Sequence, residues 1–600
     1  MKRYFLLILG IYLIFHHNSS FALDAAALEY RVSILEPHTH YFEVEITMKR
    51  PQGNYIDFKM PVWTPGSYLI REYAGNVEGF RAYTLEDNSF LEISKLNKNT
   101  WRVNLMSNAD LAITYRVYAF AGSVRMSYLD EGHAFIMANT LLMYVDEFRS
   151  SPSILKLEYP DRWTSLSTSL RSVGGRKNSF IAANYDVLVD SPIEIGNHHV
   201  INFKSEGVEH EVAIFGNVQI DEARLVRDFG QIVESATAIF QDNPNERYTF
   251  IVHTDRRQGG LEHLNSTVIG VDRYTFMDER KYKDFLSLVA HEYLHLWMVK
   301  RLKPVELEEI DYENEVYTDL LWVMEGFTEY FECKIMLRSG LYSEQQFINT
   351  LLRKMAGLKN LSGSSVQSVA DASFDAWIKF YRRNENSNNT QVSYYDKGMV
   401  LAALLDLQII FGSNGKKSLD DVVKELYDDF YIKKDKGIRV FDLKKYCEEL
   451  ARVDLTDFFK DYVGGTRPLD NDKYFKFAGI ELERSRKGLA TNSLGLTYRV
   501  QSGRLFISSI QRGGAAYNSG LNSGDELIAL GDHRIDNNNY QLILNNYTHG
   551  DRVKVIVGRR GLILEKEIVI MNDESVQYTY RQLDDRSKPQ IKAYNSWLGK

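Results

Sequence analysis

Three residues in the stretch from Leu286 to Lys300, LSLVAHEYLHLWMVK, have the types and spacing of a zinc site: His291, Glu292 and His295. Two histidines four positions apart on a helix lie on one face, roughly one turn of about 5.4 Å from each other, so both rings can reach one ion. A carboxylate beside such an ion can take a proton from water, while the metal lowers the pKa of that water toward about 7 and polarises a carbonyl group. The pattern predicts peptide-bond hydrolysis. The alternative is a chance occurrence on an ordinary amphipathic helix.

A second apolar stretch, from Val316 to Glu332, supplies the expected third ligand. It predicts a helix that contains Glu325 among apolar residues. Because burial of an unpaired carboxylate is costly, Glu325 needs a partner, and zinc would be one. Two histidines and one glutamate, with water in the fourth position, form a catalytic zinc set. Glu329, one turn later, is placed to orient a ligating histidine. The alternative for Glu325 is an ordinary ion pair with Arg or Lys.

The substrate side of the site is expected at a glycine turn before the zinc helix. Gly259, Gly260 and Glu262 belong to the sequence GGLEH, which precedes a possible edge strand from Leu264 to Val271. The unpaired backbone groups of an edge strand can hold an extended peptide. Glu262 would then face the free amino terminus of the substrate. A solvated glutamate is the alternative.

The sequence YYDKG, residues 394–398, opens the apolar helix expected from Met399 to Ile410. A tyrosine hydroxyl near the metal can donate a hydrogen bond to the oxyanion of a tetrahedral intermediate. The residues alone do not choose between Tyr394 and Tyr395, and both also suit a packed core.

The composition excludes several classes of protein. The chain has 72 Lys and Arg against 80 Asp and Glu, a net charge of −8, and no long basic run, so nucleic acid is not an expected partner. Its two cysteines, Cys333 and Cys447, are too few for a cysteine-rich zinc site. Because each lies in a helix-like segment, two buried thiols are expected rather than a disulfide.

The first 22 residues are predicted to be a signal peptide. Lys2 and Arg3 precede the apolar run from Tyr4 to Phe15, and Ser20-Phe21-Ala22 offers a small-x-small cleavage site. This pattern predicts export to a periplasm or out of the cell. No later stretch approaches the roughly 18 apolar residues of a membrane span. An uncleaved anchor is the alternative, for which the apolar run is short.

The whole chain has 600 residues, which is long enough for about three to five domains. Residues 23–217 alternate in short strand-like segments, which predicts an antiparallel β-sandwich that contains the rigid turn WTPGSY, most simply a packed loop without chemistry. Residues 218–340 hold a helix expected from Asp221 to Gln241 and the zinc helix. Residues 341–485 are helical in pattern, with an exposed loop from Arg383 to Thr390. A tail is expected over 576–600.

Residues 486–575 resemble a PDZ domain. They change to short strands and glycine turns, with GGAA at 513–516 and SGDEL at 523–527. Leu494, Gly495 and Leu496 stand in the place of the loop whose backbone amides hold the terminal carboxylate of a peptide. Such a domain is either a site for a peptide carboxy terminus or a structural appendage.

Together these motifs resemble the glycyl aminopeptidase family of gluzincin zinc metallopeptidases, distant relatives of aminopeptidase N, with an appended PDZ domain. The resemblance implies a multidomain α+β fold: an amino-terminal antiparallel β-sandwich, a thermolysin-like catalytic domain with a helical carboxy-terminal subdomain, and the PDZ-like β domain. The link of 30 positions from His295 to Glu325 is longer than in aminopeptidase N relatives but compatible with this family.

The resemblance also implies roles for individual residues. One Zn²⁺ per chain would be held by His291, His295 and Glu325, with Glu292 as the catalytic base. The GGLEH motif would recognise the substrate amino terminus through Glu262, and Tyr395 would stabilise the transition state. A preference for glycine or alanine as first residue rests on the resemblance alone.

The predicted function is a zinc aminopeptidase that removes amino-terminal residues from peptides. One alternative is a zinc endopeptidase, which would cleave blocked peptides as well as free ones. The other is an exported peptide-binding protein with an inactive metallopeptidase core, in which the PDZ-like domain does the work. The intact motif set argues against this last alternative.

Overall fold

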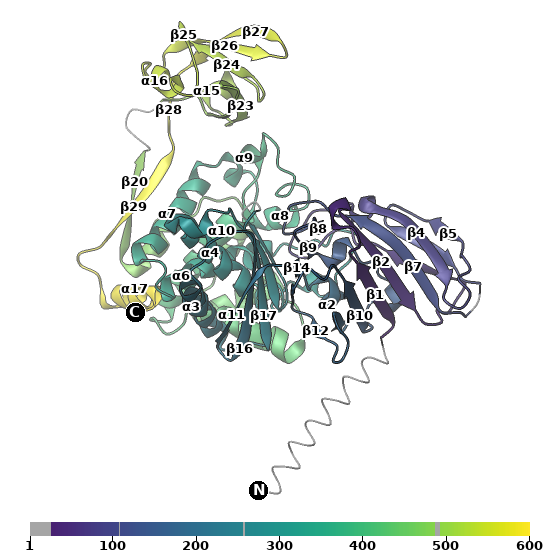
Figure 1. The fold of residues 1–600 in the computed structure, drawn as a ribbon. Helices are drawn as coiled ribbons and strands as arrows, with labels where there is room; N and C mark the ends of the chain where they lie inside the picture. Colours follow the sequence, from purple (N-terminus) through teal and green to yellow (C-terminus); the bar gives the residue numbers. More distant parts are fainter. Residues whose placement is uncertain (1–25, 107, 256–258, 487–491) are drawn as a thin grey trace. The chain divides into compact units, whose positions relative to one another are not determined.

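The computed structural model describes residues 26–106, 108–255, 259–486 and 492–600 (Figure 1). They form two compact units: the first holds the described residues up to Arg301 together with Glu309–Val316, and the second holds Leu302–Glu308 together with the described residues from Tyr317 onward. The predicted signal peptide, residues 1–22, lies outside the described residues. Among the described residues, every helix is too short or too polar to cross a membrane.

The first unit begins with a β-sandwich, as the alternating pattern predicted. Its largest sheet has seven strands, which in spatial order are β12 (Arg171–Ser172), β13 (Ser179–Ala182), β10 (Ser153–Glu158), β1 (Leu28–Ser33), β2 (Tyr41–Met48), β7 (Leu111–Tyr118) and β4 (Val77–Thr84). The pairing is antiparallel except between β1 and β10, which run parallel.

Two smaller sheets complete the sandwich. One has the order β3 (Tyr55–Lys59), β6 (Thr100–Asn104), β5 (Ile93–Lys95), and the other β11 (Ser165–Thr168), β14 (Ile193–Gly196), β9 (Ala134–Ile136), β8 (Tyr128–Leu129). Buried residues from all three sheets belong to one hydrophobic core. The alternation of buried and solvent-facing positions, seen throughout β2, is what a half-buried sheet requires.

The first unit also contains a five-stranded sheet that positions the predicted site. Its spatial order is β15 (His199–Ser205), β16 (Val208–Phe215), β17 (Arg247–His253), β19 (Ser266–Gly270) and β18 (Gly259–Glu262). This sheet therefore starts before residue 218, where the catalytic domain was predicted to begin. The edge strand is β18 itself, since β19 lies between β17 and β18. The prediction that Leu264–Val271 forms the edge was wrong, because strand order is set by tertiary pairing.

Two helices pack with this sheet (Figure 1). Helix α3 (Glu222–Phe240) begins at the predicted N-cap, Asp221, whose side chain accepts a hydrogen bond from the backbone N–H of Arg224. Helix α4 (Glu279–Leu294) begins at Asp278 in the same way and contacts β18 and β19. The apolar pattern of the zinc helix runs through Trp297 in the sequence, but the helix ends at Leu294, so His295 is its C-cap.

The second unit is helical at its centre, around α10 (Tyr394–Gly412), which is buried over most of its length. The predicted helix over 316–332 is two helices, α5 (Leu321–Met324) and α6 (Gly326–Arg338), with Glu325 between them. Further helices are α2 (Tyr185–Val189) in the first unit and α7 (Glu344–Asn360), α9 (Ser387–Thr390) and α14 (Asn471–Phe475) in the second. The segment 383–390 is not simply an exposed loop, because Ser387 and Asn389 are buried.

The region with the PDZ-like motifs has its own hydrophobic core. Its six-stranded sheet has the order β22 (Leu496–Gln501), β23 (Arg504–Ile510), β24 (Glu526–Leu530), β26 (Arg552–Arg559), β27 (Leu562–Val569), with β25 (His533–Arg534) beside β24. Two short helices, α15 (Ala515–Asn518) and α16 (Tyr540–Leu544), accompany it, and the short strands β21 (Asn492–Ser493) and β28 (Met571–Asn572) pair with each other.

The predicted tail is wrong as a description of residues 576–600. Strand β29 (Val576–Gln582) pairs with β20 (Ile480–Arg486), and helix α17 (Lys588–Leu598) buries Trp597 completely. The indole N–H of Trp597 donates to the Tyr330 hydroxyl, 2.9 Å away. The carboxy terminus is therefore part of the core of the second unit. Cys333 and Cys447 are free and buried, as predicted.

Candidate active site

The end of helix α4 is fixed by contacts on several sides. The hydroxyl of Tyr293 lies 3.1 Å from Nε2 of His210 and accepts a hydrogen bond from the side chain of Asn243. Just past the helix, the Trp297 ring stacks on Phe240 at 4.9 Å, and its indole N–H donates to a backbone carbonyl. These contacts hold the residues that carry the predicted chemistry.

His291 and His295 are buried with their Nε2 atoms 3.1 Å apart. Two nitrogens bound to one tetrahedral zinc at about 2.0–2.1 Å lie about 3.3 Å from each other, so the observed spacing fits a shared ion. Nδ1 of His295 lies 3.3 Å from the Met298 carbonyl oxygen. If that nitrogen carries the proton, Nε2 keeps its lone pair for a metal, as is usual for ligating histidines. The donor pair in the first unit therefore fits zinc.

Glu292 lies directly against the edge strand β18. A Cβ atom on Gly260 would be 2.0 Å from Oε1 of Glu292, far inside any van der Waals contact. Glycine at position 260 thus lets this buried carboxylate approach the strand backbone. The structure brings together the predicted base and the predicted peptide-binding strand.

Glu262 ends the same strand and is 4% exposed, so the alternative of a solvated glutamate is wrong. Among the described residues, its Oε1 has no hydrogen-bond partner. Its neighbour is Gly66 of the WTPGSY turn, where an added Cβ would lie 2.3 Å from the same oxygen. Gly66 has φ +86°, a conformation that favours glycine. The turn that was expected to be a packed loop without chemistry thus lies against the predicted amine-binding carboxylate.

This turn is held in place by its own hydrogen bonds. The Arg71 guanidinium donates to the hydroxyl of Ser67 at 2.8 Å, and the Trp63 indole N–H donates to the backbone carbonyl of Asp311 at 2.6 Å. Trp63 is fully buried. The position of Gly66 beside Glu262 is consequently fixed by contacts of the turn with Arg71 and Asp311 rather than by the edge strand.

Two further residues contact this part of the site and were missed in the sequence. Arg125 donates to the backbone carbonyl of Gly260 at 3.1 Å. Asp190, the C-cap of α2, accepts hydrogen bonds from the Leu264 backbone N–H and from Lys300, and contacts Nδ1 of His263, all within 2.9 Å. Asp190 therefore ties the end of β18 to the segment after the zinc helix.

The neighbouring Lys300 and His263 keep the carboxyl group of Asp190 ionised. Burial alone would raise the pKa of this carboxyl, but the Lys300 ammonium and the His263 ring lower it to about 2. Asp190 therefore remains charged at every pH at which a peptidase would normally be assayed.

The other predicted site residues lie in the second unit. Glu325 is 1% exposed at the junction of α5 and α6. The next residue, Gly326, meets Gly398 of α10, where an added Cβ would lie 2.4 Å from the Gly398 Cα. The close contact of the two helices at these glycines fixes the position of Glu325 relative to the start of α10, which contains Tyr395. Glu329 forms an ion pair of 3.2 Å with Lys354.

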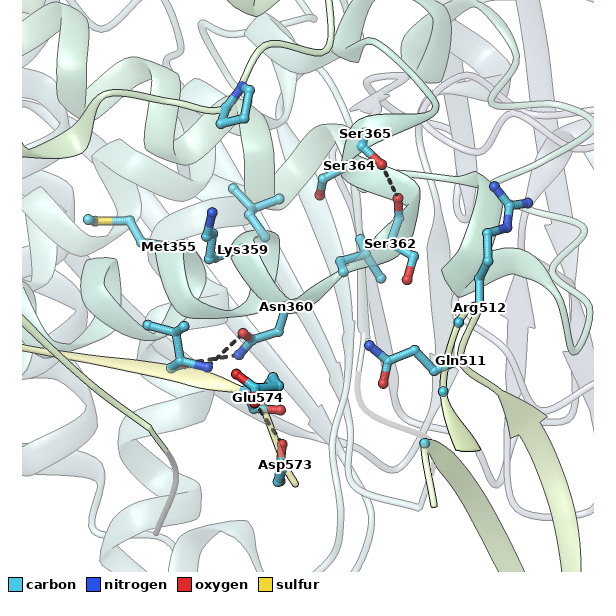
Figure 2. A pocket seen from close by; sticks show the side chains of 18 of the residues that line it. Met355, Lys359, Asn360, Ser362, Ser364, Ser365, Gln511, Arg512, Asp573 and Glu574 are labelled. Atoms are coloured by element: carbon cyan, nitrogen blue, oxygen red, sulfur yellow. Dashed lines mark hydrogen bonds between the residues drawn. The ribbon is translucent and has the colours of Figure 1, made fainter. Parts of the chain in front are cut away.

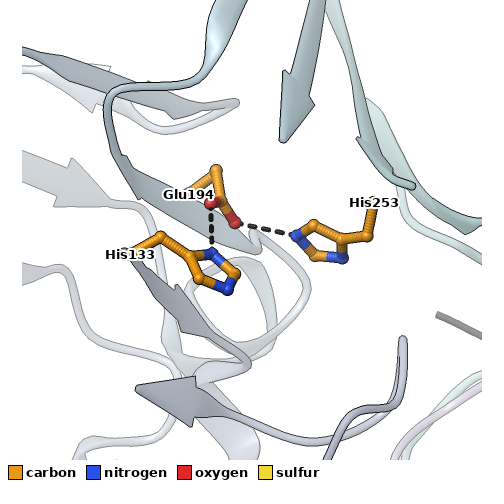
Figure 3. A group of neighbouring side chains, drawn as sticks. All are labelled: His133, Glu194 and His253. Atoms are coloured by element: carbon orange, nitrogen blue, oxygen red, sulfur yellow. Dashed lines mark hydrogen bonds and ion pairs between the residues drawn. The ribbon is translucent and has the colours of Figure 1, made fainter. Parts of the chain in front are cut away.

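A second His and Glu cluster lies elsewhere in the first unit (Figure 3). His133, Glu194 and His253 are completely buried, and the carboxylate meets the two imidazoles at 2.6 and 2.9 Å. Burial would raise the pKa of Glu194, but the two rings hold it well below its usual range. A separation of 2.6 Å is that of a direct hydrogen bond and is shorter than the roughly 3.3 Å between ligands of one zinc. This cluster is a buried network that joins β14 to β17.

The predicted carboxylate loop of the PDZ-like region is engaged by its own fold. Leu494 is buried in the local core, and its carbonyl accepts a hydrogen bond from Ala516 N–H at 2.7 Å. The Gly495 N–H donates to the Ser493 hydroxyl at 3.0 Å. Leu496 begins the edge strand β22. Binding of a peptide carboxylate by this loop stays a prediction.

The chain matches known families in two places. Residues 29–197 match the Peptidase M61 N-terminal domain, and residues 284–401 match the M61 glycyl aminopeptidase family. No curated protein matches the chain.

Solved structures resemble it as well. An aminopeptidase N family protein from Idiomarina loihiensis is 29% identical, with a TM-score of 0.88 over 95% of this chain and 100% of that chain. An M1 zinc metallopeptidase from Deinococcus radiodurans is 12% identical, with a TM-score of 0.43 over 72% of this chain and 93% of that one, a weak likeness that says nothing about chemistry here. The matches to the two M61 family models and to the first of these structures support a peptidase.

Proposed function

We propose that the chain is a zinc-dependent aminopeptidase that removes residues, small ones such as glycine or alanine above all, from the free amino terminus of peptides. The observation that supports it best is Glu262, a buried carboxylate at the end of an edge strand, one of whose oxygens has no hydrogen-bond partner among the described residues. Such a group requires a cation, and the α-ammonium of a peptide bound along β18 would supply it.

The proposed metal set is His291 and His295 from the first unit and Glu325 from the second, with one ion per chain. The 3.1 Å spacing of the two imidazole nitrogens supports the histidine pair, and burial of Glu325 supports its need for a cation. When bound, zinc lowers the pKa of a water molecule and polarises the substrate carbonyl.

The side chains then divide the reaction among them. Glu262 binds the ammonium group at the end of β18. The first peptide carbonyl of the substrate then lies beside Glu292, the carboxylate that faces Gly260 of the same strand. Glu292 takes a proton from the attacking water and passes it to the leaving nitrogen as the C–N bond breaks. Tyr395 donates a hydrogen bond to the oxyanion that forms between these two steps. Glu329 supports a ligating histidine in this proposal.

The experiment compares free and acetylated glycyl and alanyl peptides with the mature chain and with two variants, while zinc is measured by metal analysis. We expect about one zinc per chain and cleavage of free peptides only. Glu292→Gln should retain zinc but lose turnover. Glu262→Gln should retain zinc and lose its preference for a free amino terminus.

Cleavage of acetylated peptides by the wild type would contradict the aminopeptidase and favour an endopeptidase. Undiminished turnover by Glu292→Gln would remove Glu292 as the base. The predicted signal peptide leads us to propose that this activity is located in a periplasm or outside the cell.

A further inference from the structure

A cavity of about 670 Å³ lies within the second unit (Figure 2). One wall comes from the end of α7, the turn 361–365 and Lys397 of α10. The other comes from the loop 511–515 and the start of β29. Gly495 of the predicted carboxylate loop lines the cavity, but Leu494, Leu496 and helix α16 do not, so the cavity touches the predicted peptide groove of the PDZ-like region at one residue and extends away from it toward α7 and α10.

Two asparagine side chains join the walls. The Asn389 amide donates to the Ile510 carbonyl at 2.7 Å and accepts from the Arg512 N–H at 2.8 Å. Asn360 makes the same pair of bonds with the backbone of Val576, at 3.0 and 2.8 Å, as the dashed lines in Figure 2 show. Each amide thus replaces a neighbouring strand, which makes the cavity a built feature and not a gap between loosely placed segments.

Three buried polar groups line the cavity without full hydrogen bonding. Lys397 is 3% exposed, and among the residues that the structure describes its ammonium donates only to the carbonyl of Gly465, at 3.3 Å. Within the described part of the chain, Oδ1 of Asn471 and the hydroxyl of Ser364 are buried with no partner at all. Buried polar groups normally have partners, so this combination makes the cavity a candidate site for a polar ligand.

The charges around the cavity favour an anion. In the ranges that the structure describes, neither Lys397 nor the exposed side chains of Lys359 and Arg512 have a carboxylate within 4.0 Å. Asp573 and Glu574 also line the cavity, at its β29 side. Burial lowers the pKa of Lys397 to about 8, as expected for an ammonium group without a counter-ion.

We propose that this cavity binds the carboxy-terminal end of a short peptide, with the terminal carboxylate paired with Lys397. The lining also contains apolar side chains, among them Met355, Leu358 and Leu469, and its volume is typical of pockets for organic ligands. An inorganic anion would leave most of this space unfilled. The unpartnered oxygens of Asn471 and Ser364 can accept hydrogen bonds from peptide N–H groups.

This site is separate from the proposed catalysis. Tyr395 and Lys397 lie two positions apart on α10 and so face different directions. Binding is therefore measurable in a chain that cannot cleave, and failure of the site would leave the proposed aminopeptidase activity untouched.

The test uses the full mature chain with Glu292→Gln and calorimetric titration of acetylated dipeptides that end in Ala, Leu or Phe, each as the free acid and as the carboxamide. We expect at least one acid to bind at least tenfold more tightly than its amide, because a hydrogen bond to a charged group is lost in the amide. Adding Lys397→Met should abolish this preference. The matched control is Lys379→Met, since Lys379 pairs with Asp375 and does not line the cavity.

Several results would overturn the proposal: no binding by any acid, an acid preference that survives Lys397→Met, or inorganic phosphate that binds as tightly as the peptides. Lys397→Met removes a buried charge, so this variant should fold. A second measurement, chemical labelling of Lys397, uses the chain without a substitution at this position. In reductive methylation at pH 8 followed by mass spectrometry, the binding acid should slow labelling of Lys397 at least fivefold. Equal labelling with the acid and the amide would contradict the assignment.

Discussion

The contact between Asp190 and the end of the edge strand gives the most specific test of the site. Replacement by Asn keeps the size of the side chain and removes its charge, so Lys300, whose side chain is 9% exposed, loses its ion-pair partner. The pKa of Asp190 falls from 3.8 to about 2 in the folded protein, which corresponds to about 2 kcal/mol of unfolding free energy at neutral pH. Breaking a buried pair from one side typically costs about 3–5 kcal/mol. We therefore expect Asp190→Asn to lower the unfolding free energy by about 2–4 kcal/mol.

The pH dependence has a definite sign. Because the folded pKa lies below the unfolded value, the stabilisation by Asp190 is complete at pH values well above 3.8 and is lost as the pH falls toward 2. About half of it should be gone at pH 3. The difference in unfolding free energy between the wild type and Asp190→Asn, measured in urea, should thus be about half as large at pH 3 as at pH 7.

The same variant should change substrate binding, since His263 and Leu264 directly follow Glu262. We expect KM for peptides with a free amino terminus to rise about tenfold, as for a loss of roughly 1.4 kcal/mol, while zinc content stays near one per chain. Asp186→Asn is the control, because this half-exposed residue of α2 pairs with Arg149 and not with the strand. A difference in stability that is equal at pH 3 and pH 7, or an unchanged KM, would refute this reasoning.

Three further perturbations test other parts of the structure. Gly260→Ala would place a Cβ 2.0 Å from Oε1 of Glu292, so kcat should fall at least 100-fold with zinc content unchanged. The control is Gly230→Ala in α3, which has no atom near its added Cβ and should leave kcat unaltered. Equal activity of the two variants would contradict a role for the close approach of Glu292 to the strand. Trp597→Ala removes a fully buried ring and should cost about 3–5 kcal/mol of unfolding free energy by urea titration, while a cost below about 1 kcal/mol would mean that α17 is only an appendage. A zinc chelator should abolish peptide cleavage and added Zn²⁺ should restore it, and activity that survives complete metal removal would exclude the proposed mechanism.

Much of the candidate site was predictable because its signals are local. The H-E-x-x-H spacing identified two histidines whose nitrogens lie together, and the Asp221 N-cap fixed the start of α3. The sandwich followed from alternation in the sequence, and the match of residues 29–197 to the M61 amino-terminal domain agrees with it.

The missed features depend on contacts between distant residues. Arg125 lies 135 positions before Gly260, and Asp190 lies 73 before His263, with no periodicity or motif that relates them. The order of strands, which made β18 the edge, is likewise a property of tertiary pairing. The end of α4 at Leu294 could not be predicted from the sequence, because the apolar pattern continues through Trp297 after the helix has ended.

These distant contacts explain why the sandwich is part of the candidate site. Strand β18 has four residues, two of them glycines, and within the described part of the chain it pairs only with β19. So short a strand holds little stability of its own, and glycine lowers it further. Arg125 binds its middle, Gly66 limits the position of the carboxylate of Glu262, and Asp190 fixes the residues that follow. Since all three come from the sandwich segment, the position of Glu262 relative to Glu292 depends on a domain that contributes no residue to the proposed metal set.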